Sequence, residues 1–174
     1  MKMILQNDKV RLRAIERNDI DLLFDLENNV DLWKYSNRSQ PYSRDLLQKY
    51  IANAHRDIFE IRQIKFTISI DKDVAVGFID LFDFEPLHRR AGVGLVIREQ
   101  DKSNGYGSGA LELIGNYAKN HLQLHQLYAH IAEENKISIR LFEGQGYCYA
   151  GKKKDWNFYE DRYHDEIIYQ KLIE

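Results

Sequence analysis

The segment SNGYGSGA at residues 103–110 runs directly into ALELIGNYAKNHL, which has the apolar spacing of an amphipathic helix. A strand-like run, GVGLVI at residues 92–97, precedes it. Glycines at such a junction permit left-handed backbone, and they let several N–H groups converge at the positive end of the helix dipole. That arrangement binds phosphate. The alternative is a tight glycine-rich turn that holds no ligand.

Periodicity along the rest of the chain predicts a mixed α/β fold. Strand patterns occupy residues 9–15, 61–71, 74–85, 90–99, 124–132 and two runs within 148–173, and helix patterns occupy residues 16–29, 43–55, 110–122 and 134–147. We expect Asn18 or Asp19, Ser43 and Asn135 to cap three of the helices and Gly146 to end the last one. Alternation of helices and strands in the second half predicts some parallel pairing, and the hairpins predict antiparallel pairing elsewhere.

Composition is that of an ordinary globular protein, with 44% hydrophobic and 30% charged residues in 174. We expect one domain, residues 1–174, because no linker or repeat interrupts the chain. A net charge of −2 argues against a nucleic-acid partner. The lone Cys148 excludes an internal disulfide, and the N-terminal residues lack the apolar region of a signal peptide. With no apolar run near ~20 residues, we expect a cytoplasmic protein without a membrane partner.

The glycine segment matches neither a P-loop nor a dinucleotide-binding G-x-G-x-x-G motif. It resembles the acyl-CoA diphosphate loop, Q/R-x-x-G-x-G/A, of the GCN5-related N-acetyltransferase (GNAT) superfamily, with Asn104 where Gln or Arg is usual. Residues 12–29, 77–97 and 134–147, including HRRA at 88–91, resemble the branch of spermidine and ribosomal-protein N-acetyltransferases. This resemblance implies a GNAT-like fold, with a mixed sheet of about seven strands flanked by about four helices.

The resemblance also implies a transferase that uses acetyl-CoA, an amine acceptor and no metal. A bulge in the strand at 92–97 is expected to separate it from the strand at 124–132, so that the acetyl group and pantetheine arm can lie between them. Phe142 is expected to form a wall of this acetyl site. The implied CoA-contacting residues are Gly94, Leu95, Val96, Asn104, Gly105, Tyr106, Gly107, Ser108, Gly109, Asn135 and Phe142.

Catalysis requires a base, because an amine with a pKa near ~10.4 must lose a proton before it attacks. Two positions depart from the family pattern: Phe142 replaces the usual tyrosine acid, and Gly92 replaces a frequent glutamate. Asp80 and Asp83 are therefore candidates for the base or for an amine anchor, although both could be ordinary residues of a solvated strand edge. Tyr147 is the candidate proton donor to the leaving thiolate, and Tyr106 is the other tyrosine near it in sequence. The alternatives are that the thiolate leaves unprotonated or takes its proton from water, or that turnover is slow.

The acceptor is left open between a small amine, a polyamine-type amine and a protein amino group. In the family, the loop after the first helix lines the acceptor site. Here this loop carries Lys34, Arg38 and Arg44 with no carboxylate before Asp45, which disfavours a polycation. Two alternatives remain: a CoA-binding module with weak or no transferase activity, and a scaffold whose glycine segment is only a turn. Because the edge strands of such folds often pair between subunits, a homo-oligomer is also an open expectation.

Overall fold

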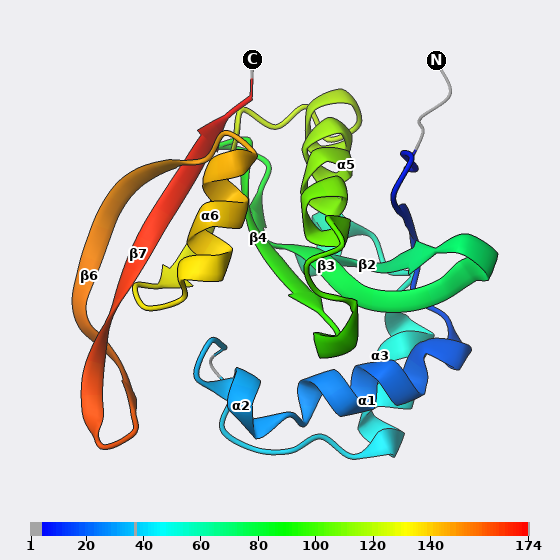
Figure 1. Ribbon diagram of the computed structural model, residues 1–174. Coiled ribbons are helices and arrows are strands. Elements are labelled where there is room, and N and C mark those ends of the chain that lie inside the picture. The colour runs from blue at the N-terminus through cyan, green and yellow to red at the C-terminus, as the bar shows by residue number, and fades with distance from the viewer. Residues whose placement is uncertain (1–4, 37, 174) are drawn as a thin grey trace.

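The computed structural model describes residues 5–36 and 38–173, and a seven-stranded sheet runs through it in the order β1-β2-β3-β4-β5-β7-β6 (Figure 1). The β4–β5 pair is parallel and the other neighbouring pairs are antiparallel, which confirms the predicted mixed sheet. The strands are β1 (Arg11–Ala14), β2 (Ile64–Ile70), β3 (Val74–Glu85), β4 (Arg90–Ile97), β5 (Gln126–Ala132), β6 (Cys148–Tyr159) and β7 (Arg162–Leu172).

Within the described residues, four helices of eight or more residues flank this sheet, as expected: α1 (Ile20–Glu27), α3 (Arg44–Asn53), α5 (Tyr106–Asn120) and α6 (Lys136–Gly144). Two single-turn helices, α2 (Val30–Trp33) and α4 (Ile58–Ile61), were not predicted as separate elements. In Figure 1, α5 and α6 lie together on one side of the sheet, apart from α1 and α3. The predicted order of elements along the chain is confirmed.

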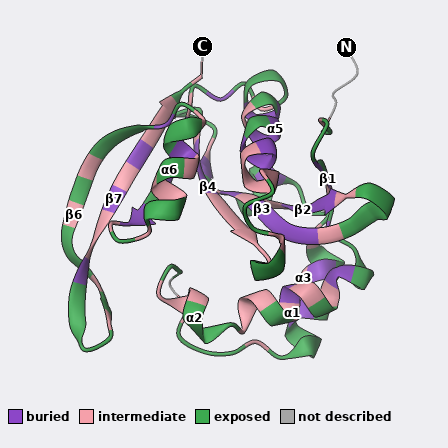
Figure 2. Cartoon of the chain, viewed as in Figure 1, coloured by how far each residue is buried: buried purple, intermediate pink, exposed green. Residues whose placement is uncertain are grey.

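The core has two parts, one on each face of the sheet, because side chains alternate along a strand. On β3, Ile79 and Leu81 pack with α5, whereas Phe78 packs with α1 and α3. Figure 2 shows the purple buried segments along β3 and α5, while β6 is largely exposed. This alternation places the side chains of Asp80 and Phe82 on the same face as Phe78, which we call the α1/α3 face.

Helix α5 begins at Tyr106, four residues before the predicted start at Ala110. Glycines were read as loop because glycine weakens a helix interior. In the structure the first turn passes close to its neighbours: a Cβ on Gly107 would lie 3.1 Å from the side chain of Leu141 and 3.3 Å from that of Leu95. Tertiary contact therefore accounts for glycine within the helix.

The predicted caps at Ser43 and Asn135 are confirmed: each side chain accepts a hydrogen bond from a backbone N–H, at 3.1 Å and 3.2 Å. Gly146 follows α6 with φ 81°, as a helix-ending glycine should. Of the two candidates for the first cap, Asn18 and Asp19, it is Asp19 that occupies the N-cap position of α1, but not with the capping hydrogen bond typical of this position. Its carboxylate makes no cap hydrogen bond to α1 and instead binds Arg13, at 2.8 Å.

Candidate active site

Strands β4 and β5 pair only over their first residues. The register is Arg90↔Gln126 to Gly92↔Tyr128, and no β5 residue pairs with the described part of β4 beyond Gly92. We call this region, residues 93–97 opposite residues 129–132, the β4–β5 divergence. It leaves backbone groups of β4 free to bind an extended ligand as an added strand would.

The bulge that was expected in residues 92–97 lies on β3 instead. The β3–β4 register shifts between Phe82 and Glu85, with Asp83 at φ 46°, while β4 itself pairs continuously from Gly92 to Ile97. Strands β4 and β5 thus separate as predicted, but the bulge lies on β3, which pairs with the other edge of β4. Asp83, a candidate for the base or anchor, is the exposed residue of this bulge.

The glycine segment forms the N-terminal end of α5, next to the β4–β5 divergence. Gly105 precedes the helix in the left-handed region, with φ 79°. The N–H groups of Tyr106, Gly107 and Ser108 have no acceptor within the helix, as in the first turn of any α-helix. They point toward the space before the helix, where its dipole is positive. These residues fit the diphosphate of CoA.

Two side chains border this anion-binding end. Lys9 lies over Gly105, where an added Cβ would come within 2.5 Å of its Nζ. The side chain of Asn104 donates to the carbonyl oxygens of Asp101, at 3.1 Å, and Lys102, at 3.2 Å. Asn104 therefore stabilises the loop conformation, which is a local role that the shorter amide can fill.

On β4, the predicted acetyl-contacting residues Gly94, Leu95 and Val96 are all half-buried within the β4–β5 divergence. Gly94 is directly opposite Asp80 of β3, and a Cβ at Gly94 would lie 2.7 Å from Asp80 Oδ1. A glycine is thus needed to leave room for this carboxylate. The structure brings Asp80 to the strand where the acetyl group is expected.

Asp80 belongs to a charged network that the sequence did not reveal. Its carboxylate accepts a hydrogen bond from Gln63, at 3.2 Å, and lies 3.8 Å from the ammonium of Lys65. Lys65 is only 12% exposed and also lies 3.9 Å from Glu27 of α1. Burial would lower the pKa of Lys65, but the nearby carboxylates of Asp80 and Glu27 raise it overall. Lys65 is therefore a stable buried cation beside Asp80.

Gly92, at the position of a frequent family glutamate, faces the ring of Phe82. A Cβ built on Gly92 would overlap that ring. Phe82 in turn packs edge-on against Tyr128, with ring centroids 6.2 Å apart. The space of the absent glutamate is therefore filled by an aromatic ring, and a side chain at residue 92 would displace it.

Phe142 and Tyr147 lie together at the end of α6. Phe142 is buried, and its ring meets that of Tyr147 edge-on at 5.0 Å. The Tyr147 hydroxyl is buried and has no hydrogen-bond partner among the described residues. Burial raises the pKa of Tyr147, so this group keeps its proton at neutral pH. A protonated, unpartnered donor fits the role predicted for it.

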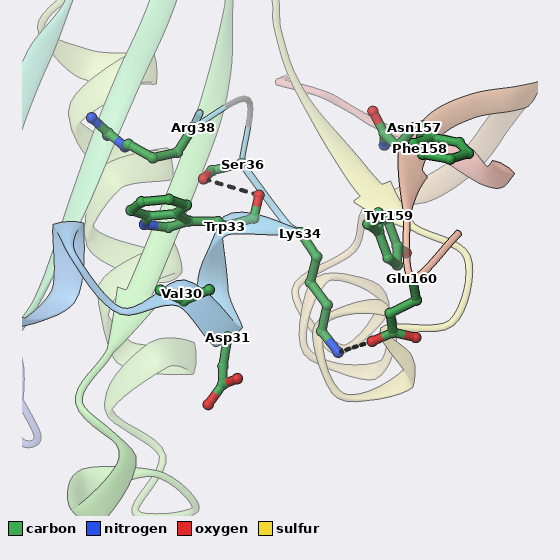
Figure 3. Close-up of a pocket in the computed structure, with 10 residues that line it drawn as sticks. All are labelled: Val30, Asp31, Trp33, Lys34, Ser36, Arg38, Asn157, Phe158, Tyr159 and Glu160. Carbon is green, nitrogen blue, oxygen red and sulfur yellow. Dashed lines mark hydrogen bonds and ion pairs between the residues drawn. The ribbon is translucent and has the colours of Figure 1, made fainter. Parts of the chain in front are cut away.

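A pocket of about 480 Å³ lies between the α2 segment and the turn that joins β6 to β7 (Figure 3). Lys34 points across it to Glu160, at 3.6 Å, and Arg38 forms an ion pair with Glu27. All three cations that disfavoured a polycation are thus paired with carboxylates: Lys34 with Glu160, Arg38 with Glu27, and Arg44 with Asp21. The lining residues are Val30, Asp31, Trp33, Lys34, Ser36, Arg38, Asn157, Phe158, Tyr159 and Glu160.

The β6–β7 wall of the pocket is held by a buried histidine. His164 lies 2.8 Å from Glu134 and stacks on the ring of Tyr159, with centroids 3.6 Å apart. The Tyr159 hydroxyl donates to the same carboxylate at 2.5 Å. These contacts fix Tyr159 toward the pocket. Sequence periodicity carried no signal for them, since the three residues come from separate segments.

Two further findings concern the described part of the chain. Within residues 5–36 and 38–173, no group of three or more His, Cys, Asp and Glu side chains is placed to hold a metal ion. Over the same residues, no helix has the length and apolar character needed to cross a membrane.

The chain belongs to the GNAT acetyltransferases: the family model described as acetyltransferase (GNAT) domain matches residues 9–147. The resemblance inferred from the glycine segment is thereby confirmed. Its family and the activities of its relatives identify the protein as an acyltransferase of the N-acetyltransferase type, with acetyl-CoA as the donor. The fit of the α5 end to a diphosphate agrees with this donor.

Several of the similar proteins are named as spermidine acetyltransferases, so their names give a polyamine as the substrate. Spermidine N(1)-acetyltransferase of Vibrio cholerae is 26% identical over 159 residues, covering 91% of this chain and 90% of that protein. The Escherichia coli spermidine N(1)-acetyltransferase is 25% identical over 158 residues, covering 91% and 83%. The crystal structure of the Vibrio cholerae enzyme with CoA and spermine superposes with a TM-score of 0.86 at 25% identity, covering 96% and 97%.

Proposed function

We propose that residues 1–174 act as a single domain that transfers the acetyl group of acetyl-CoA to a primary amine entering from the pocket between α2 and the β6–β7 turn. The observation that carries this proposal is the β4–β5 divergence, because it opens beside the N-terminal end of α5. Diphosphate at α5 and an extended arm along β4 would bring the thioester to Gly94, Leu95 and Val96.

Asp80 and Asp83 are proposed to attract the acceptor ammonium. Asp80 lies over Gly94 on the α1/α3 face, and Asp83 is exposed on the neighbouring bulge. Each supplies negative charge beside the strand where the thioester is expected. Asn135 and Phe142 are proposed to complete the CoA site from α6, where Asn135 caps the helix and Phe142 is buried beside Tyr147.

The acceptor class is proposed as a small or polyamine-type amine, with a protein amino group as the other candidate. The pocket is lined by Trp33, Phe158 and Tyr159. Of its two cations, Lys34 pairs with Glu160 in the pocket and Arg38 pairs with Glu27 outside it. It therefore does not repel a polycation. The spermidine acetyltransferases named above favour this choice, and a protein acceptor would have to insert a flexible terminus.

An acceptor screen tests this function. CoA-thiol release from acetyl-CoA would be followed with spermidine, spermine, single amino acids, aminoglycosides and peptides with a free N-terminus. We expect turnover with the small di- and polyamines and little with the peptides. Binding of acetyl-CoA without acceleration by any amine would instead favour the alternative of a CoA-binding module with weak or no transferase activity.

Tyr147→Phe tests the proposed proton donor. We expect kcat to fall by about 10²-fold, because the leaving thiolate loses its acid, while the affinity for CoA stays nearly the same. Since the hydroxyl is buried without a described partner, the free energy of unfolding should stay constant or rise by up to about 1 kcal/mol. An unchanged kcat would remove Tyr147 from the mechanism; a large loss of stability would show that its hydroxyl is hydrogen-bonded.

A homo-oligomer stays a prediction. β6 is the outer strand of the sheet, and its aromatic side chains Tyr149, Trp156 and Phe158 are more than half exposed. Light scattering of the purified protein at several concentrations would measure its mass in solution.

A further inference from the structure

We propose that His130 of β5 is the general base that removes the proton from the acceptor amine. The proposal rests on the proposed function and deepens it, since it assigns a step that the predicted site residues left without a suitable group. Asp80 and Asp83 then attract the ammonium, and His130 accepts its proton.

The first argument is position. Tyr128 is opposite Gly92 in the last β4–β5 pair, and His130 is the second residue beyond it, within the β4–β5 divergence. In a regular sheet the partner of His130 would be Gly94, so the two residues lie on opposite sides of the place where the strands separate. Gly94 is the residue covered by Asp80.

The second argument is that these side chains share one face of the sheet. Phe82 lies over Gly92 and contacts Tyr128 edge-on, so Tyr128 is on the α1/α3 face. His130 follows two residues later and contacts Tyr128, with ring centroids 5.4 Å apart. Asp80 precedes Phe82 by two residues. The imidazole and the Asp80 carboxylate therefore project to the same side of the β4–β5 divergence.

The third argument is charge. His130 Nδ1 lies 3.6 Å from Glu166 Oε1, but Lys153 already pairs with that oxygen at 2.5 Å. The carboxylate is thus neutralised and does not hold the ring as an imidazolium. Burial and then Lys153 lower the pKa of His130 below its usual value, while Glu166 and Asp83 oppose this more weakly. At pH 7 the ring is neutral and able to accept a proton.

The ring also remains accessible, with 33% of its side chain exposed. At 3.6 Å, Nδ1 is too far from Glu166 for a hydrogen bond, and neither ring nitrogen has a hydrogen-bond partner among the described residues. A lone pair of the neutral ring is therefore free to accept a proton. This combination of a neutral ring, a free nitrogen and partial exposure is what a base acting on an entering amine requires. Asp80 has a different environment, because its carboxylate lies 3.8 Å from the Lys65 ammonium and accepts a hydrogen bond from Gln63. It therefore contributes negative charge near Gly94, while His130 supplies the free proton acceptor.

The step balances as follows. The ammonium R–NH₃⁺ gives one proton to the unprotonated ring nitrogen of His130, and the amine nitrogen bonds the thioester carbonyl carbon while the carbon–sulfur bond breaks. The nitrogen loses a second proton, which ends on the CoA sulfur. The products are the acetamide and CoA thiol, and the imidazolium returns its proton to water.

His130→Gln tests the proposal with the best amine from the acceptor screen. We expect kcat/KM at about pH 7 to fall by about 10²-fold or more. The deficit should shrink toward about pH 10, where the amine is largely neutral in solution. His125→Gln is the matched control, because it makes the same change at an exposed residue just before β5. CoA-induced thermal stabilisation should be equal in all three proteins.

Two additional measurements separate catalysis from structure. Millimolar imidazole should restore part of the rate of His130→Ala, and NMR titration of the wild-type imidazole should give a pKa below 6.5. A near-wild-type rate of His130→Gln with an unchanged pH profile, or a titration above 6.5, would overturn the proposal. Absence of amine-dependent thiol release in the wild type would instead contradict the proposed function, and it would be seen before any variant is compared.

Discussion

Asp19→Ala is expected to lower the free energy of unfolding by about 3–5 kcal/mol, the range for removing one partner of a buried ion pair. Asp19 is 3% exposed, and Arg13 binds both of its oxygens, at 2.8 Å and 2.9 Å. The Thr67 hydroxyl donates to it at 2.9 Å and the Glu16 N–H at 2.8 Å. The variant removes the buried acceptor of two further donors and of the Arg13 guanidinium, which keeps its exposed partner Asp73. Urea unfolding of the purified proteins measures the difference.

The same residue predicts an acid dependence of stability. Burial would raise the pKa of Asp19, but hydrogen bonds from Arg13, the Glu16 N–H and Thr67 lower it overall. A carboxyl group with a lowered folded-state pKa stabilises the fold above its unfolded value, near ~3.9, and this contribution is lost as pH falls through the folded value. The loss from Asp19→Ala should therefore be full near pH 7 and diminish below about pH 4.

Asp73→Ala is the matched control, because Asp73 is the second partner of Arg13 but is 52% exposed. An exposed pair of this kind contributes about 0–1 kcal/mol. Equal losses from the two variants would show that burial of Asp19 is not the reason for its effect. A loss from Asp19→Ala that does not change between pH 7 and pH 3 would contradict the ion-pair explanation.

Local features of the fold could be predicted from sequence, while contacts between distant segments could not. Ser43 and Asn135 cap helices through residues three positions away, so the signal lies within one short segment. Asp19 looked like such a cap but binds Thr67, 48 residues away. The start of α5 was missed for a similar reason: glycine is tolerated at Gly107 only because Leu141 and Leu95 approach it.

The candidate site likewise combines local features that the sequence predicts with contacts between distant segments that it does not. The proposed CoA contacts are made largely by backbone groups, and a glycine pattern marks where the backbone is accessible, so the motif alone predicts this loop. The Lys65–Asp80 pair and the Phe82 ring over Gly92 depend on the register between strands. His130 gives no local signal, because Lys153 and Glu166 come from β6 and β7. The surroundings of these residues are set by the register between strands and by charged side chains from distant segments.

Ser108→Glu is expected to weaken CoA binding by about 10²-fold. Ser108 is in the first turn of α5, where the proposed diphosphate accepts hydrogen bonds from backbone N–H groups. A carboxylate within about 5 Å of a phosphate charge, at an effective dielectric constant near 20, is repelled by about 3 kcal/mol. The same carboxylate interacts favourably with the helix dipole, so the ligand-free protein should be as stable as the wild type or more stable. Calorimetric titration with CoA measures the affinity.

Ser108→Gln provides the matched control, since glutamine has nearly the shape of glutamate without its charge. Both variants lose the hydrogen bond that Ser108 accepts from Gln145, at 2.6 Å. We therefore expect Ser108→Gln to bind CoA within a few-fold of the wild type. Raising the salt from about 0.05 M to 0.5 M should recover part of the affinity of Ser108→Glu by screening. Equal losses from Glu and Gln would attribute the effect to size, and normal binding by Ser108→Glu would place the diphosphate away from the N-terminal end of α5.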